Sequence, residues 1–146
     1  MFPFVPARLP GFAAAALIAL AVPVHAENAA KPNYPAVPLI ATGKTTIGET
    51  IRYPQGEAHI TAAIVTLAPG ARTIAHRHGV PMFAYILEGE ITVDYGAHGK
   101  RTYRKGDALM EAMDAAHFGE NTGTVPVRLI AVYMGAAGAK DVIPAQ

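Results

Sequence analysis

The sequence predicts an all-β domain, and three observations support that prediction. Short runs of β-branched and aromatic residues follow one another from residue 45 onward, and turn signals such as Pro69-Gly70 and Gly106-Asp107 separate them. Apolar and polar residues alternate in EITVDYG, residues 90–96. No useful window outside the first 26 residues has a helical period. Small all-β domains whose short strands are separated by such turns close into barrels or double-sheet jelly rolls.

The first 26 residues have the pattern of a secretory signal peptide. They carry one basic residue, Arg8, no acidic residue, and an apolar run from Phe12 to Val24 that ends in Val24-His25-Ala26. The run is short for a membrane span, which needs about 20 apolar residues, and an uncleaved anchor is the alternative. We expect cleavage, a periplasmic or secreted protein, and no stable membrane insertion after processing.

After the signal segment, residues 27–38 are rich in proline and alanine and predict a flexible lead-in, and residues 39–146 form the folded domain. The predicted strands lie at 45–53, 59–67, 71–78, 82–87, 90–96, 100–106, 108–113 and 127–135. Residues 129–134, LIAVYM, are apolar on both faces, as in a strand that is covered on both sides or meets a partner subunit. We therefore expect a homodimer, because an exposed apolar strand is an association site.

Composition excludes several classes of function. The whole chain has 12 basic and 11 acidic residues, and Arg8 is the only formal charge in the signal segment, so the remainder is balanced. A balanced charge argues against a nucleic-acid partner, because phosphate binding needs a basic face. The absence of cysteine excludes a disulfide framework, a thiol nucleophile and thiolate metal ligands.

Three histidines are the strongest candidates for a functional site. His76 and His78 are two residues apart, so on a strand their side chains leave the same face about 7 Å apart. His117 lies in a second turn-strand-turn element, and closure of the barrel would bring it to the first two. Three imidazoles suit zinc, copper, iron or nickel and leave coordination positions open. The alternative is that all three are packed or solvated histidines.

The spacing around these histidines resembles the two motifs of the cupin superfamily. The first motif, G-x5-H-x-H-x3,4-E-x6-G, is matched by Gly70, His76, His78 and Gly89, with Met82 in the place of the glutamate.

The second motif, G-x5-P-x-G-x2-H-x3-N, is matched by Gly106, His117 and Asn121, while Ala112 and Asp114 replace the proline and the second glycine. The resemblance spans roughly residues 60–134 and implies a single-domain cupin β-barrel or double-stranded jelly roll.

The resemblance also implies a ligand set and a range of functions. His76, His78 and His117 match the cupin metal ligands, and the cofactor is expected to be a divalent transition metal: iron, manganese, zinc, nickel or copper. Met82 either fills space or, as a thioether ligand, favours copper. We expect a metal-dependent enzyme acting on a small molecule, dioxygenase-like, with isomerase or lyase chemistry next. A non-catalytic metal- or ligand-binding cupin and a structural cupin without an ion are the alternatives.

The sequence contains further titratable residues near these motifs. Glu111 could act as an acid or base near His117, or form a salt bridge on a strand face. Glu57 and His59 share a strand face and could lie near the site or in solvent. His98 is expected at a hairpin tip, and Tyr85 on the face opposite Met82.

Overall fold

The computed structural model describes residues 35–145, and its regular elements are nine β-strands and one short 3-10 helix. Within these residues no helix is long and apolar enough to cross a membrane. The predicted signal segment 1–26 and residues 27–34 of the lead-in lie outside the described residues. The elements are β1 (Ala58–Leu67), β2 (His76–Arg77), β3 (Met82–Glu88), β4 (Glu90–Asp94), η1 (Gly96–His98), β5 (Lys100–Arg104), β6 (Ala108–Met110), β7 (Phe118–Glu120), β8 (Val127–Ala136) and β9 (Ile143–Pro144).

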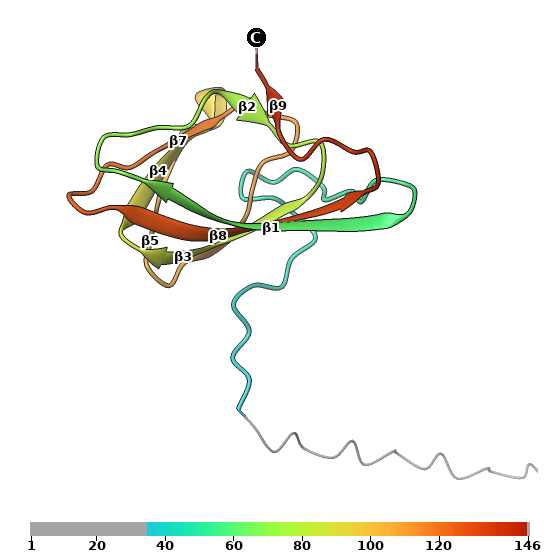
Figure 1. Cartoon of the computed structure of the whole chain (residues 1–146), viewed down its shortest axis with the longest axis horizontal. Helices are drawn as coiled ribbons and strands as arrows, with labels where there is room; N and C mark the ends of the chain where they lie inside the picture. Colours follow the sequence, from blue (N-terminus) through green and yellow to red (C-terminus); the bar gives the residue numbers. More distant parts are fainter. Residues whose placement is uncertain (1–34, 146) are drawn as a thin grey trace, which may run out of the picture. The chain divides into compact units, whose positions relative to one another are not determined.

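The strands form three antiparallel sheets, which confirms the predicted all-β fold. One sheet has the order β1-β8-β3-β6, a second has the order β5-β4-β7, and β2 pairs with β9 (Figure 1). The turn between β3 and β4 needs Gly89, which has a φ of 69° and whose missing Cβ would lie 2.7 Å from the Pro126 carbonyl oxygen. An L-residue there would be strained and would also clash.

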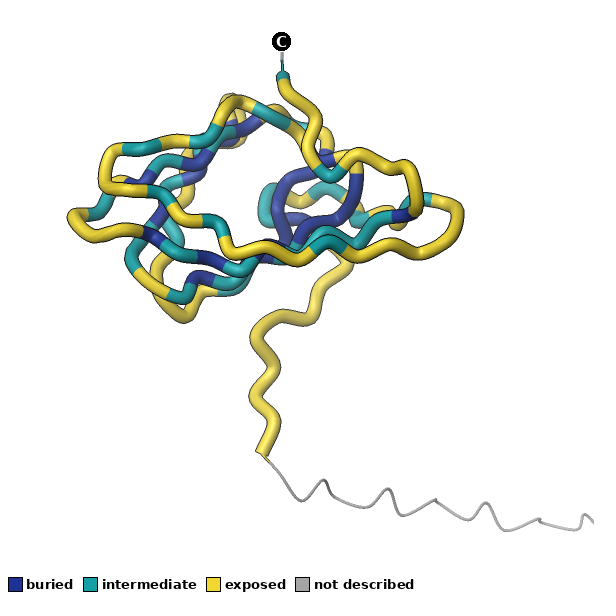
Figure 2. Tube along the Cα trace, in the orientation of Figure 1, coloured by how far each residue is buried: buried dark blue, intermediate teal, exposed yellow. Residues whose placement is uncertain are grey.

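Alternating residues of the two larger sheets build one apolar core. The predicted face of β4 is confirmed, because Ile91, Val93 and the following Tyr95 are all buried. Strand β8 buries its alternate residues in the same way, and Figure 2 shows buried segments on β3, β4 and β8, whereas β1 is largely exposed. The core consists of Met82, Ala84, Ile86, Ile91, Val93, Tyr95, Leu109, Ala112, Val127, Leu129 and Ala131. The site described below lies against this core.

Three of the predicted strands are absent or much shorter in the structure, and the two predicted at 90–96 and 100–106 each end two residues early, at Asp94 and Arg104. Residues 45–53 contain no strand. Thr50 forms only an isolated bridge with Lys44, and between them the Thr45 hydroxyl accepts the backbone N–H of Glu49 in a local turn. Within 71–78 only β2 is a strand, and within 108–113 only β6 is. The short strand β7 was not among the predicted runs, and it continues from His117.

Candidate metal centre

Backbone hydrogen bonds bring the three histidines together from two distant segments. His76 and His117 face each other as a bridge, in which each backbone N–H donates to the other's carbonyl at 2.9 Å. The N–H of His78 donates to the carbonyl of Met113 at 3.1 Å. The fold therefore places His117 beside the His-x-His pair, as closure of the barrel predicted.

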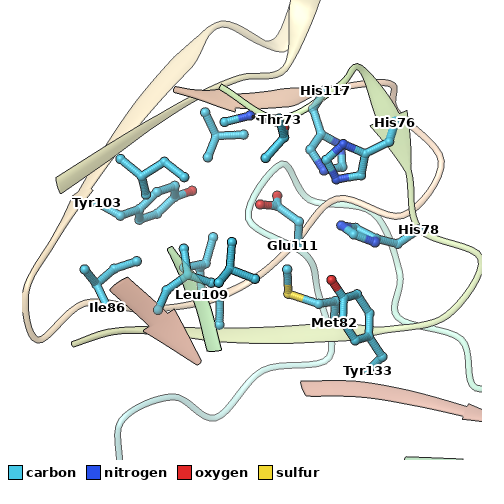
Figure 3. A pocket seen from close by; sticks show the side chains of 16 residues that line it. Thr73, His76, His78, Met82, Ile86, Tyr103, Leu109, Glu111, His117 and Tyr133 are labelled. Atoms are coloured by element: carbon cyan, nitrogen blue, oxygen red, sulfur yellow. Dashed lines mark hydrogen bonds between the residues drawn. The ribbon is translucent and has the colours of Figure 1, made fainter. Parts of the chain in front are cut away.

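The three imidazole rings converge on one point (Figure 3). The ring centroids are 4.9 Å apart for His76 and His78, 4.6 Å for His76 and His117, and 5.1 Å for His78 and His117. One nitrogen from each ring lies within 4.8 Å of the other two. A single ion placed between three such nitrogens could be bound by all of them, because histidine nitrogens bind ions such as zinc at about 2.0–2.1 Å.

Hydrogen bonds to backbone carbonyls fix the tautomer of each ring. The Nδ1 atom of His76 lies 2.8 Å from the Ile74 carbonyl oxygen, that of His78 lies 3.0 Å from the Asp141 oxygen, and that of His117 lies 2.9 Å from the Ala115 oxygen. A carbonyl only accepts, so each Nδ1 carries the proton and each Nε2 keeps a lone pair. Metal-binding histidines are oriented in this way by their outer hydrogen bonds.

Two of the three remaining nitrogens have no hydrogen-bond partner among the described residues. Nε2 of His78 and Nε2 of His117 are buried and make no hydrogen bond, and both residues are only 3% exposed. An unpaired buried acceptor costs about 1–3 kcal/mol, so it calls for an explanation. A cation bound between the lone pairs would satisfy them. The residues therefore fit a divalent metal in both geometry and donor chemistry.

The protonation of the rings favours metal binding as well. Burial lowers the pKa of His78 to about 4, and its hydrogen bond to the Asp141 carbonyl opposes only part of that effect. Burial also lowers the pKa of His76, which is half-buried. Because only neutral imidazole can act as a ligand, both rings are available to a metal ion at neutral pH.

The histidines form part of the wall of a small cavity of about 80 Å³. Most of its other walls are apolar and come from strands of both larger sheets. The lining residues besides the histidines are Val65, Thr73, Met82, Ala84, Ile86, Ile91, Val93, Tyr103, Leu109, Glu111, Gly119, Leu129 and Tyr133. A cavity of this size and lining accommodates a molecule of a few non-hydrogen atoms beside the histidines.

Met82 lines this cavity, as its place in the motif predicted. It is 8% exposed, it pairs with Tyr133 across β3 and β8, and Figure 3 shows the two side chains side by side near His78. Tyr133 packs against His78, with 5.6 Å between the ring centroids.

Glu111 also lines the cavity, and the salt bridge considered from the sequence is not among the ion pairs of residues 35–145. Its side chain is buried, with 5% of the residue exposed. The other candidates lie elsewhere. Glu57 and His59 are exposed, His98 is exposed in η1, and Tyr85 does not line the cavity.

Glu49 is a structural contributor that the sequence did not reveal. Its carboxylate accepts backbone hydrogen bonds from Met113 at 2.7 Å and from Asp114 and Ala115 at 3.0 Å. It also accepts the Thr45 hydroxyl at 3.2 Å. Glu49 thereby holds the loop that leads to His117, where the motif proline and glycine are replaced. The partners are backbone N–H groups, which leave no pattern in a sequence.

Comparison with known proteins identifies the domain. Residues 63–133 match the family model described as a cupin domain. No curated protein matches the chain. Among solved structures, oxalate decarboxylase from Bacillus subtilis at pH 4.6 is 28% identical, with 52% of this chain and 21% of that chain covered and a TM-score of 0.44. The formate complex of Lactobacillus farciminis oxalate decarboxylase is 27% identical, with 58% and 26% covered and a TM-score of 0.49. The chain thus spans about a quarter or less of these proteins.

Proposed function

This chain carries a domain of the cupin family, and from the histidine cluster inside that domain we propose that the protein binds one divalent transition ion and uses it on a small organic molecule. His76, His78 and His117 would hold the ion through their Nε2 atoms. The observation that carries the proposal is the pair of buried Nε2 atoms without a hydrogen-bond partner, in rings whose Nδ1 protons are committed to carbonyls.

The chemistry we propose is that of a metal-dependent, dioxygenase-like enzyme. A bound divalent ion supplies Lewis-acid polarisation of a substrate oxygen, or dioxygen binding if it is iron or copper. The chain's own residues would supply the rest: three neutral ligands that leave positions open, and mostly apolar walls around a small cavity. Isomerase or lyase chemistry could use the same arrangement.

Metal analysis and oxygen consumption test this proposal in sequence. The purified protein should contain close to one transition ion per chain, and the metal-loaded protein should consume dioxygen with one or more small phenols, thiols or diketones. A protein that binds metal but turns over none of them would favour the non-catalytic alternative, for which the scarcity of polar lining groups is an argument. A protein without affinity for any divalent transition ion would overturn the proposal.

We expect Met82 to shape the cavity without binding the ion. Met82→Leu keeps the volume and removes the sulfur, so it should retain the metal and lower the free energy of unfolding by less than about 1.5 kcal/mol. Met82→Glu should tighten binding of manganese or iron relative to copper, because carboxylate oxygen suits harder ions. Metal titrations of the two variants and the parent check both results. Loss of copper binding in Met82→Leu would show that the sulfur is a ligand.

We further propose that the protein is exported and that residues 1–26 are removed. The support is the single basic residue followed by an apolar run and Val24-His25-Ala26. The intact mass of the protein from its native host should correspond to a chain that begins at Glu27. A mass that still includes the run from Phe12 to Val24 would instead indicate a membrane anchor.

We also propose a homodimer in which the outer face of the β1-β8-β3 sheet meets a second copy. Strand β1 is an edge strand, and Ile60 and Ile64 on its outer face are 59% and 52% exposed. They continue an apolar surface onto β8, where their partners are Met134 and Ile130. Such a surface is typical of an association site.

Light scattering should therefore give the mass of two chains at micromolar concentration. The double variant Ile60→Lys/Ile64→Lys should give the mass of one chain and retain its metal, because these side chains point away from the cavity. Val125→Lys, which changes another exposed apolar residue in a loop, is the matched control and should stay dimeric. A monomeric parent would refute the dimer.

A further inference from the structure

Glu111 lies beside Met82, the residue that stands where the first motif has a glutamate. Its backbone N–H donates to the carbonyl of Met82 at 2.9 Å, so Glu111 stands just beyond the end of β6 and directly beside Met82 on β3. The first motif has Met82 in place of a glutamate, and Glu111 on the neighbouring segment places a carboxylate in the same cavity. This carboxylate is buried, which is rare for glutamate without a charged partner.

The carboxylate of Glu111 reaches into the cavity. One carboxylate oxygen, Oε1, accepts the backbone N–H of Ala112 at 2.8 Å, and the carboxylate also interacts with the hydroxyl of Tyr95. Figure 3 shows the carboxylate in the middle of the cavity, with the three histidines on one side and Tyr103 on the other. The carboxylate is therefore in position to meet a ligand in the cavity.

Of the titratable groups in and around the cavity, Glu111 is the one best suited to take up a proton. The titratable side chains whose protonation is affected by its charge are His76, Tyr95, Tyr103 and Tyr133, and they come from four segments of the chain. Burial raises the pKa of all three phenols, and the Glu111 charge raises it further, so they stay protonated at neutral pH. Among the described residues that line the cavity, Glu111 is the only carboxylate.

Glu111 is not placed as a fourth ligand. The ligand atoms that lie within 4.8 Å of one another are those of the three histidines alone. Its carboxylate faces the space in which a substrate bound beside the histidines would lie. A carboxylate in the wall of the cavity can exchange a proton with a substrate held there while it keeps its own hydrogen bond to Ala112.

We propose that Glu111 is the acid–base residue of this cupin, which takes a proton from a compact substrate held beside the three histidines. The inference rests on the proposed function, because the substrate is positioned by the metal site. In the step, an O–H or activated C–H bond of the substrate breaks and its electron pair stays on the substrate. The proton forms a new O–H bond on the carboxylate of Glu111, which becomes a neutral acid and later returns the proton to the product or to water.

This role also defines a class of substrate. The substrate enters as a neutral molecule with a weakly acidic proton, such as a hydroxamic acid, an enolisable ketone or a phenol of few atoms. A molecule that is already dianionic is disfavoured, because the buried carboxylate of Glu111 repels it. The small volume of the cavity excludes large aromatic substrates.

Proton counting during ligand binding tests the inference without an activity assay. The probe is acetohydroxamic acid, which is neutral in water near pH 7 and binds metal ions as an anion. Calorimetric titration of the zinc-loaded protein in buffers of different ionisation enthalpy gives the number of protons released per probe bound. The parent protein should release almost none, because Glu111 takes up the proton, whereas Glu111→Gln should release about one.

Two further variants make the result decisive. Glu111→Asp keeps a carboxylate and should return the proton count toward that of the parent, and Glu120→Gln, on β7 outside the cavity lining, should behave as the parent. All variants should still bind close to one zinc ion per chain, since Glu111 is not a ligand. Equal proton release in the parent and in Glu111→Gln would overturn the role of Glu111 alone. A parent that binds neither zinc nor any other divalent transition ion would overturn the proposed function, and the role of Glu111 with it.

Discussion

Replacing His117 with alanine should empty the metal site. The expected metal content falls from close to one ion per chain to a small fraction, because one of three ligands is lost and no other described residue can replace it within 4.8 Å. The loss of affinity should exceed the 10- to 100-fold that is typical of changes in outer-shell partners of a metal site. Elemental analysis of protein purified under identical conditions measures the content, and titration with zinc measures the affinity.

His117→Ala should remove the ligand without changing the backbone around residue 117. The hydrogen bonds that join residues 76 and 117 are between backbone atoms, so alanine leaves them intact. His98→Ala is the matched control, since His98 is exposed in η1 and should retain the parent's metal content. Full occupancy in His117→Ala, with that control also loaded, would contradict a three-histidine site.

Glu49→Gln should give the largest loss of stability among single changes outside the core. The carboxylate accepts three backbone N–H groups and one hydroxyl, and hydrogen bonds to a charged group contribute about 1.5–3 kcal/mol each. The amide of glutamine can keep part of this set, but its NH₂ group then faces N–H donors. We expect the free energy of unfolding to fall by about 2–4 kcal/mol.

Thermal unfolding of the metal-free protein measures this effect. A change of this size lowers Tm by roughly 8–16 °C in a domain of this length. Glu57→Gln, which removes the same charge from an exposed position, is the control and should shift Tm little. Because the loop held by Glu49 leads to His117, Glu49→Gln should also weaken zinc binding. Equal Tm shifts in the two variants would refute the role of Glu49.

The sequence predicted the parts of this molecule that repeat a local pattern. Alternation in residues 90–96 indicated which side chains face the core, and the motif spacing indicated the histidines that the fold brings together. It also indicated that Met82 faces the same cavity. These predictions succeeded because strand period and motif spacing are properties of neighbouring residues.

Features that depend on distant partners were not predictable in this way. Residues 45–53 have strand-like composition, but Glu49 is bonded to backbone N–H groups more than 60 residues away, and a loop forms instead. The carbonyl of Asp141 that orients His78 is also invisible in the sequence, because any residue offers a carbonyl. The fate of Glu111, cavity or salt bridge, was settled only by its burial beside Met82.

The carbonyl hydrogen bonds of the three histidines have a consequence for how metal enters and leaves. Each ring is anchored before any ion arrives, so capture does not have to order a flexible chain and loses little conformational entropy. Release of an ion would break only its bonds to the Nε2 atoms, so the rings would stay anchored and ready to bind again. We expect the metal-free protein to keep the three rings in the arrangement that binds an ion.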